Sequence, residues 1–241
     1  MVIEENHSYP QIIGSSSAPY INSLASRGAL FTNSHAVGHP SEPNYMALFA
    51  GSTFGIAGDP CPVTESGASL ASELIAAGHT YASYSESMPS QGYTGCSSGE
   101  YARKHNPAAN FTSLPPALNK TFAQFPADYA SLPTVCFVDP SLLDDMHDGT
   151  ISQADTWLKT HFSSYVTWAA ANNSLLIVTW DENDGSAGNQ IATIFAGAHI
   201  KSGHYGENIS HYNVLRTLEQ AYGLKALGAG ATAAPITDVF G

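Results

Sequence analysis

The sequence predicts an α/β fold, with a single domain built on a mostly parallel central β-sheet flanked by helices on both faces. Continuous apolar runs at 134–138 and 175–180 indicate strands that are buried on both faces. Segments with helical spacing and helix-end residues alternate with these runs. A chain of 241 residues with 43% apolar side chains, and with no internal repeat or linker, fits one domain over residues 1–241.

The N-terminal part alternates short strands and helices. Residues 1–4 begin with three apolar side chains and predict a strand, which a polar turn follows. A helix is predicted over 18–28 because Pro19 stands in its first turn and Gly28 just past its end. The next predicted elements, in chain order, are a strand at 30–33, a helix at 43–50, a helix at 69–77 and a strand at 80–85.

The segment 88–133 is rich in Gly, Pro, Ser and Asn, which predicts a long excursion with few regular elements. Loops of this length in a compact domain usually serve function. Regular patterns then return as a strand at 134–139, a helix at 152–172, strands at 175–180 and 191–196, and a closing helix at 212–222.

The charge balance excludes several partners. The chain has 20 Asp and Glu residues against 8 Lys and Arg, for a net charge of -12. Nucleic-acid binding and polybasic membrane anchoring both depend on clustered cations, so neither is expected. No apolar run approaches the ~18–20 residues of a transmembrane helix. The charged fraction of 12% is well below the typical ~25%, a pattern more familiar from secreted than from cytosolic proteins.

Oxygen-bearing side chains follow three predicted strands: Glu4, Glu5 and Asn6, then residues 139–148, then Asp181 and Glu182. The carboxyl ends of parallel strands meet at one edge of a sheet, where ligands bind. Carboxylates gathered there repel one another, and a divalent cation would neutralise them. Oxygen ligands suit Ca, Mg or Mn, with Zn and Fe also compatible. Each residue alone also fits a polar position where a strand meets water.

Ser41, in the stretch 38–45, fits two interpretations. It precedes a predicted helix, whose amides and dipole would favour a nucleophile that attacks phosphate. The same spacing, taken alone, favours an ordinary N-cap serine. His105, His147 and His211 are candidates for acid–base or charge-stabilising roles, although a lone histidine is more often structural.

Cys61 and Cys96 both lie in loop segments and form a disulfide candidate.

Six segments occur in an order that resembles the phosphoesterase family of acid phosphatases and non-specific phospholipases C, within the alkaline phosphatase superfamily. They are Glu-Glu-Asn-His-Ser-Tyr at 4–9, His-Pro-Ser-Glu-Pro-Asn-Tyr at 39–45, Tyr-Ala-Arg-Lys-His-Asn-Pro at 101–107, Asp-Asp-Met-His-Asp-Gly at 144–149, Thr-Trp-Asp-Glu-Asn-Asp-Gly at 179–185 and His-Tyr-Asn-Val-Leu-Arg-Thr-Leu-Glu at 211–219. Each segment alone is a weak signal of the family, whereas six segments in the family's order are a specific one.

The resemblance implies a set of site residues. One divalent metal would be held by Glu5, Asn6, Ser41, Asp181 and Glu182, with Ser41 also the nucleophile. His105 and His147 would stabilise charge or protonate the leaving oxygen. A second metal would fall near Asp144, His147 and His211. Glu182 stands where two-metal members usually have His, which favours one metal and leaves the second site open.

The expected function is therefore metal-dependent hydrolysis of small phosphate monoesters through a phosphoserine at Ser41. The phospholipase C branch usually has Thr at that position and a longer chain, so phosphodiester or phospholipid hydrolysis is the alternative. A degenerate member that binds metal or glycan is a third. The family implies a secreted, periplasmic or cell-surface protein with a leader preceding this chain. The sequence does not fix the metal, the natural substrate or the oligomeric state.

The scarcity of cations bears on the chemistry. Positive charge at the phosphate would come mainly from the metal, the amides after Ser41 and protonated histidines. This predicts activity that is biased toward acidic pH and lost when the metal is removed.

Overall fold

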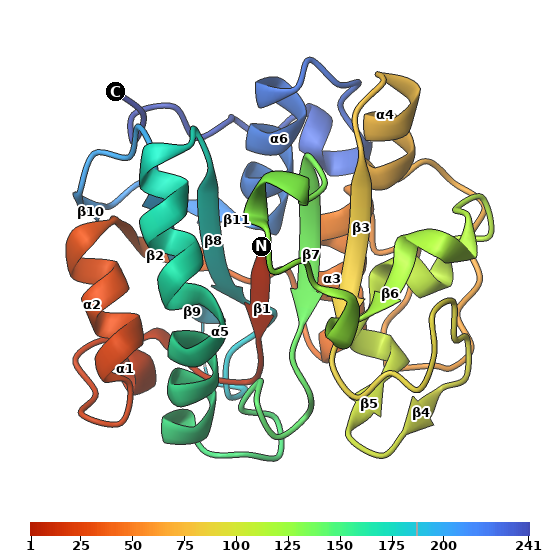
Figure 1. Ribbon diagram of the computed structural model, residues 1–241, viewed down its shortest axis with the longest axis horizontal. Helices are drawn as coiled ribbons and strands as arrows, with labels where there is room; N and C mark the ends of the chain where they lie inside the picture. The colour runs from red at the N-terminus through yellow and green to blue at the C-terminus, as the bar shows by residue number, and fades with distance from the viewer. Residues whose placement is uncertain (187) are drawn as a thin grey trace. The chain divides into compact units, whose positions relative to one another are not determined.

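The computed structural model describes residues 1–186 and 188–241 (Figure 1). The chain divides into two compact units, and it passes between them several times. The first unit comprises Met1–Ala36, Leu142–Ile209 and Thr237–Gly241, and the second comprises Val37–Ser141 and Ser210–Ile236. The single-domain organisation expected over 1–241 stays a prediction.

In the described part of the first unit, strands follow one another across the sheet in the order β10-β2-β9-β8-β1. Their bounds are β1 Val2–Glu4, β2 Ala29–His35, β8 Leu175–Trp180, β9 Gln190–Gly197 and β10 Gly203–Tyr205. β1 pairs with β8 and β10 with β2 in parallel, whereas β9 is antiparallel to both of its neighbours. The loop between β8 and β9 is too short for the crossover that a parallel connection needs, so β9 departs from the expected parallel arrangement.

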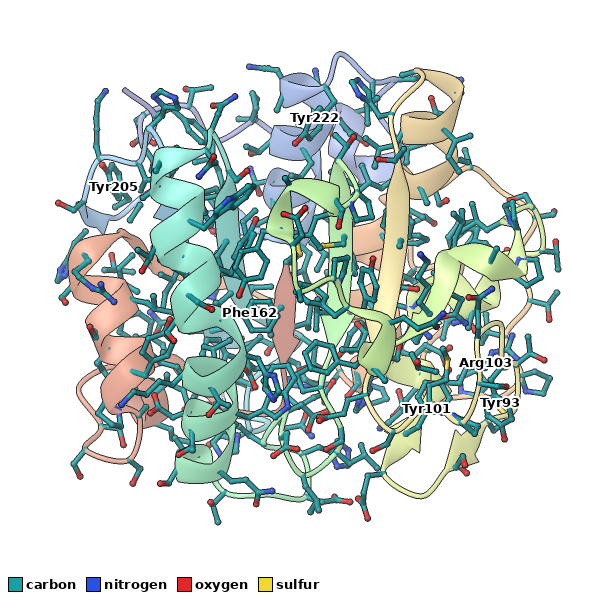
Figure 2. The ribbon with its side chains drawn as sticks, in the orientation of Figure 1. Tyr93, Tyr101, Arg103, Phe162, Tyr205 and Tyr222 are labelled. Atoms are coloured by element: carbon teal, nitrogen blue, oxygen red, sulfur yellow. A yellow bond between two sulfur atoms is a disulfide. The ribbon has the colours of Figure 1, made fainter. Side chains whose placement is uncertain are left out.

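Three helices belong to this unit: α1 Tyr9–Ile12, α2 Pro19–Arg27 and α5 Ile151–Ala171. α5 packs against α2, β8 and β9, and it buries Phe162 (Figure 2). From the same helix, the buried carboxylate of Asp155 accepts hydrogen bonds from the backbone amides of Tyr20 (3.1 Å) and Ile21 (2.8 Å). These amides lie in the first turn of α2, so Asp155 satisfies donors that the helix itself cannot.

In the second unit, β7 Val135–Asp139 and β6 Asn119–Thr121 both pair in parallel with β3 Tyr81–Ser85. Its helices are α3 Ser41–Ala50, α4 Leu70–Ala76 and α6 His211–Ala221. All ten residues of α3 are buried, and the helix ends at Gly51, whose positive φ of 69° suits glycine. The strands and helices predicted from the sequence are thus present, which confirms the α/β fold with mostly parallel strands.

The expected excursion at 88–133 is confirmed as a stretch of short elements. It holds the two-residue strands β4 Ser97–Ser98 and β5 Tyr101–Ala102, short 3-10 turns, and β6. The remaining short elements are β11 Ile209–Ser210 and a 3-10 turn at Gly228–Ala231. The sequence pattern did not predict β6, β10 or β11, which have only two or three residues each; all three residues of β6 are polar or charged.

The predicted disulfide is confirmed: Cys61 and Cys96 are joined, with their Cα atoms 5.8 Å apart. Among the described helices, no segment combines the length and apolarity that spanning a bilayer would require.

Candidate active site

Two strand ends of the first unit lie next to each other because of the strand register. Glu4 of β1 pairs with Trp180 of β8. One residue further on, the amide of Asp181 donates to the Glu4 carbonyl at 2.9 Å. The amide of Asn6, which has a positive φ of 53°, donates to Asp181 Oδ1 at 3.2 Å. The structure therefore brings Glu5, Asn6 and Asp181 to one edge, as the sequence predicted.

The acidic side chains at this edge are buried. Glu5 is 0% exposed, Asp181 1% and Glu182 6%. Glu4 is also fully buried, and its pKa is raised well above the usual value, chiefly by burial and further by the negative charges of Asp145 and Asp144. Several carboxylates are thus withdrawn from water at one place, which is electrostatically costly without a neutralising group.

Some of these oxygens lack donors. Among the described residues, neither carboxylate oxygen of Glu4 has a hydrogen-bond partner, and the Oδ1 atom of Asn6 has none either. Buried acceptors are normally satisfied, so such oxygens mark a place where a cation or water would bind. An amide oxygen with nearby carboxylates is a donor set that fits a hard divalent ion. The residues present therefore fit the expected metal.

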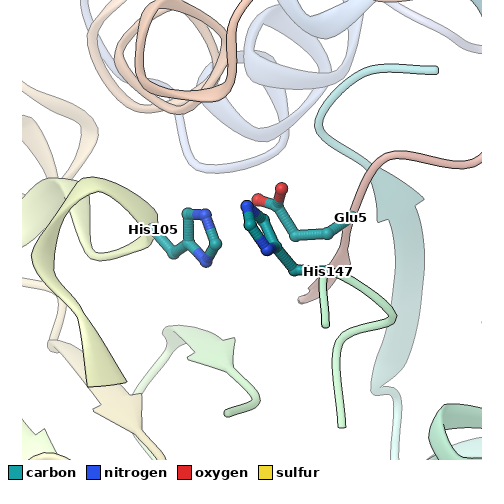
Figure 3. Close-up of side chains that lie close together, drawn as sticks. All are labelled: Glu5, His105 and His147. Carbon is teal, nitrogen blue, oxygen red and sulfur yellow. The ribbon is translucent and has the colours of Figure 1, made fainter. Parts of the chain in front are cut away.

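His147 lies on the loop before α5 and is held in place by hydrogen bonds to neighbouring residues. Its amide donates to Asp145 Oδ1 at 2.8 Å, and its Nδ1 atom bonds to Asp148 Oδ1 at 2.7 Å. The carbonyl of Asp145 also accepts from the Glu5 amide at 2.8 Å. A Glu5 carboxylate oxygen and a His147 ring nitrogen lie within 4.8 Å of each other (Figure 3). Asp145 thus holds both residues by their backbones.

In the second unit, Ser41 is the first residue of α3, and Pro40 occupies the N-cap position. The interpretation of Ser41 as an N-cap is therefore wrong. The loop before it is braced by Asn44, whose Oδ1 accepts from the amides of Val37 (2.9 Å) and Gly38 (3.1 Å), while its Nδ2 donates to the Gly38 and Pro40 carbonyls. Ser41 is 1% exposed and stands on a rigid support.

Glu42 follows Ser41 and is a buried acid. Its amide donates to Asp59 Oδ1 at 2.9 Å, and its Oε1 accepts from Asn110 Nδ2 at 2.9 Å. Burial raises the pKa of Glu42 to about 7, and the Asp59 charge adds to this, while Asn110, Arg103 and Lys104 oppose it. Glu42 therefore titrates near neutral pH.

Two predicted histidines belong to this unit. His105 ends the short 3-10 turn Arg103–His105, is 3% exposed, and stacks its ring on Tyr45 with centroids 5.2 Å apart and planes 12° apart. The stacking fixes the orientation of the imidazole. His211 is 1% exposed and begins α6 after the N-cap residue Ser210.

The proposed second metal set is Asp144, His147 and His211. Asp144 is half-buried, and its Oδ1 accepts from Gln153 Nε2 at 3.1 Å. Asp144 and His147 belong to the first unit, and His211 belongs to the second. The second metal stays a prediction.

Sequence reasoning assigned no individual role to three acids that the structure buries. Glu4, Asp145 and Glu42 are each no more than 1% exposed. Their positions at a strand end, in the acidic loop and beside Ser41 were visible, but the spacing gave no sign of which acids are buried. Asp145, rather than the chosen Asp144, is the buried acid of its loop.

Comparison with known proteins decides the family. The family model described as "Phosphoesterase family" matches residues 11–225. The chain belongs to the phosphoesterase family. This phosphoesterase is 54% identical to the phosphatidylinositol-3-phosphatase of Mycobacterium tuberculosis, over all of this chain and 82% of that protein. It is 32% identical to the phosphate-repressible acid phosphatase of Penicillium chrysogenum, over 86% of this chain and 55% of that protein.

Solved structures share the fold of this chain, and one of them is an alkaline phosphatase superfamily protein. A superfamily protein from Vibrio parahaemolyticus aligns with a TM-score of 0.65 at 12% identity, over 98% of this chain and 69% of that one. A phosphonate monoester hydrolase from Silicibacter pomeroyi aligns with a TM-score of 0.67 at 10% identity, over 98% and 75%. At such identities the likeness concerns the fold. With the family match and the phosphatase relatives, the chain is a phosphoester hydrolase.

Proposed function

We propose that this phosphoesterase is a metal-dependent phosphomonoesterase of the acid phosphatase type, acting through a phosphoserine at Ser41. The observation that carries the proposal is the position of Ser41 as the first helical residue of α3, with the N-cap position left to Pro40. A buried serine at the positive end of a ten-residue helix is suited to attack phosphorus.

The donor set for the metal is Glu5, Asn6, Asp181 and Glu182, with Ser41 as a further contact. When bound, a divalent ion would supply charge neutralisation at the phosphoryl oxygens and lower the pKa of the attacking hydroxyl. The buried acids and the donor-less Asn6 oxygen support this set. The metal can be Ca, Mg, Mn, Zn or Fe.

The proposed reaction has two steps. Ser41 Oγ, once its proton has passed to water, forms a bond to phosphorus while the bond to the leaving oxygen breaks, and His105 or His147 gives that oxygen a proton. His211 contributes to charge stabilisation. Water then attacks phosphorus, the bond to Ser41 breaks, and inorganic phosphate leaves. Tyr45 stacking and the Asp145 and Asp148 contacts hold the two imidazoles in fixed orientations.

The substrate we propose is a small phosphate monoester. The Mycobacterium tuberculosis relative is named a phosphatidylinositol-3-phosphatase, which supports an inositol lipid monophosphate as one candidate. We also propose an extracytoplasmic location, because the Cys61–Cys96 disulfide persists in oxidising compartments.

The test compares wild type, Ser41→Ala and the control Ser52→Ala on an aryl phosphate, with and without chelator. Ser41→Ala and chelated wild type should both lose activity, while Ser52→Ala retains it. Acid-quenched wild type should carry one phosphoryl group on Ser41 by mass spectrometry. Unchanged turnover in Ser41→Ala would refute the mechanism.

Faster turnover of a diester than of its monoester would favour the phospholipase C alternative, and metal binding without hydrolysis would favour a degenerate member.

A further inference from the structure

The second unit contains a cavity of about 370 Å³ that the proposed chemistry does not use. Its walls come from the excursion at 92–119 and from Thr64. The cavity falls in the size range of small-molecule sites. Polar atoms of Arg103 and Asn110 meet an apolar surface formed by Leu114, Pro116 and Leu118.

Arg103 is the cation in the cavity wall, and it is 6% exposed. Its Nε donates to Asn110 Oδ1 at 2.9 Å. Its Nη2 donates to the carbonyls of Val63 (2.7 Å) and Ala109 (2.9 Å), and its Nη1 donates to the carbonyl of Thr94. Figure 2 shows Arg103 in the same region as Tyr93 and Tyr101, whose rings are 5.8 Å apart.

All four acceptors are neutral, and the Glu42 carboxylate, which interacts with the Arg103 charge, is linked to it only through Asn110. A guanidinium has five N–H donors, and among the described residues the second donor of Nη1 has no acceptor. No carboxylate of the described residues forms an ion pair with this guanidinium. A buried charge without an ion pair is costly.

The composition of the cavity wall also favours a negatively charged ligand. The chain has 20 Asp and Glu residues and only 8 Lys and Arg, yet no acid is among the described residues that line the cavity. Three threonines, Thr64, Thr94 and Thr112, line it as well. A cavity with one buried cation, no acid and an apolar side is complementary to an anion that carries an apolar group.

We propose that this cavity binds a small organic anion, whose charged group meets the Arg103 guanidinium and whose apolar part lies against Leu114 and Pro116. A purely structural role for Arg103, in which it holds the loops together, accounts for its four hydrogen bonds. It does not account for the open cavity beside the guanidinium. None of the described residues that line the cavity is assigned a step in the phosphoester chemistry at Ser41, so the cavity is tested independently of the proposed mechanism.

The probe pair is phenylacetate and its neutral analogue phenylacetamide, titrated calorimetrically into the full chain. The buffer contains no phosphate, because that anion would compete with the probe for the Arg103 guanidinium. Wild type should bind phenylacetate at least tenfold more tightly than phenylacetamide. Thr64→Trp, which fills the cavity from its exposed rim, should weaken phenylacetate binding at least tenfold, whereas Thr64→Ser should bind as wild type does.

Aryl phosphate turnover and the thermal midpoint of Thr64→Trp should equal those of wild type, because Thr64 has no part in the phosphoester chemistry. If its midpoint falls, Thr94→Trp fills the cavity from another rim position and provides the same comparison. Arg103→Lys, which keeps the charge but not the planar fork, should weaken phenylacetate binding while leaving phenylacetamide unchanged. Equal affinities of wild type for the two probes, or unchanged phenylacetate binding in the cavity-filling variant, would overturn the proposal.

Discussion

Asn110 joins two buried charged residues: its Nδ2 donates to Glu42 Oε1 at 2.9 Å, and its Oδ1 accepts from Arg103 Nε at 2.9 Å. Glu42 follows the proposed nucleophile Ser41 in α3. A side chain from the excursion thus contacts the second residue of that helix, directly after the proposed nucleophile.

Asn110→Ala should lower both stability and turnover. It leaves a buried carboxylate and a buried guanidinium each short of one partner, so the free energy of unfolding should fall by about 2–3 kcal/mol. Denaturant titration measures this loss, and kcat on an aryl phosphate should fall with it. The control Asn172→Ala removes an exposed hydrogen bond to the Trp168 carbonyl and should change little. Equal effects of the two substitutions would contradict the expected role of Asn110.

Asp155→Ala should destabilise the first unit. The substitution removes two charge-assisted hydrogen bonds to the amides of Tyr20 and Ile21, with an expected loss of about 3 kcal/mol in the free energy of unfolding. Asp128→Ala is the control, because Asp128 caps a short exposed 3-10 turn through the Ala130 amide. Hydrogen exchange should show faster exchange in α2 for Asp155→Ala alone; unchanged protection there would refute the capping role.

Asp181→Asn should reduce metal content. Removing one negative charge from the buried donor set weakens its attraction for a divalent cation. Metal per chain, measured by elemental analysis after dialysis, should fall at least tenfold at limiting free metal. Asp184→Asn alters an exposed acid in the same loop and should retain wild-type metal content. If both variants keep their metal, the proposed ligand set is wrong.

Glu219→Gln should flatten the dependence of stability on pH. Burial raises the pKa of the Glu219 carboxyl, an effect that the Leu227 amide and Arg216 oppose. The folded state therefore holds this proton to higher pH than the unfolded state does. The resulting stability is fully present below the unfolded pKa and is lost as pH rises through the folded value.

Unfolding measured from pH 4 upward should show a smaller decline with rising pH in Glu219→Gln than in wild type. Glu100→Gln, on the turn between β4 and β5, serves as the charge control and should keep the wild-type slope. If the free energy of unfolding falls with pH as steeply in Glu219→Gln as in wild type, groups other than Glu219 cause the decline.

Several features followed from the sequence because they depend on local chemistry. Helix-end residues located α2 and α4, and continuous apolar runs located β7 and β8. The strand-end positions of Glu5 and Asp181 followed from the same runs, since a residue that ends a buried strand must emerge at the sheet edge. The short loop after β8 also shows why β9 runs antiparallel, although the apolar pattern alone indicated only a strand.

The tertiary structure decided what depends on contacts between distant residues. Spacing could not distinguish buried Asp145 from half-buried Asp144, because burial depends on which segments pack over a loop. It could not show that Asp155 would satisfy amides at Tyr20 and Ile21, more than 130 positions away. Nor could spacing show that Ser41 would be the first residue of the helix and Pro40 its N-cap. The sequence by itself determined which chemical groups the sheet edge would offer, and long-range packing decided which of them would be withdrawn from water.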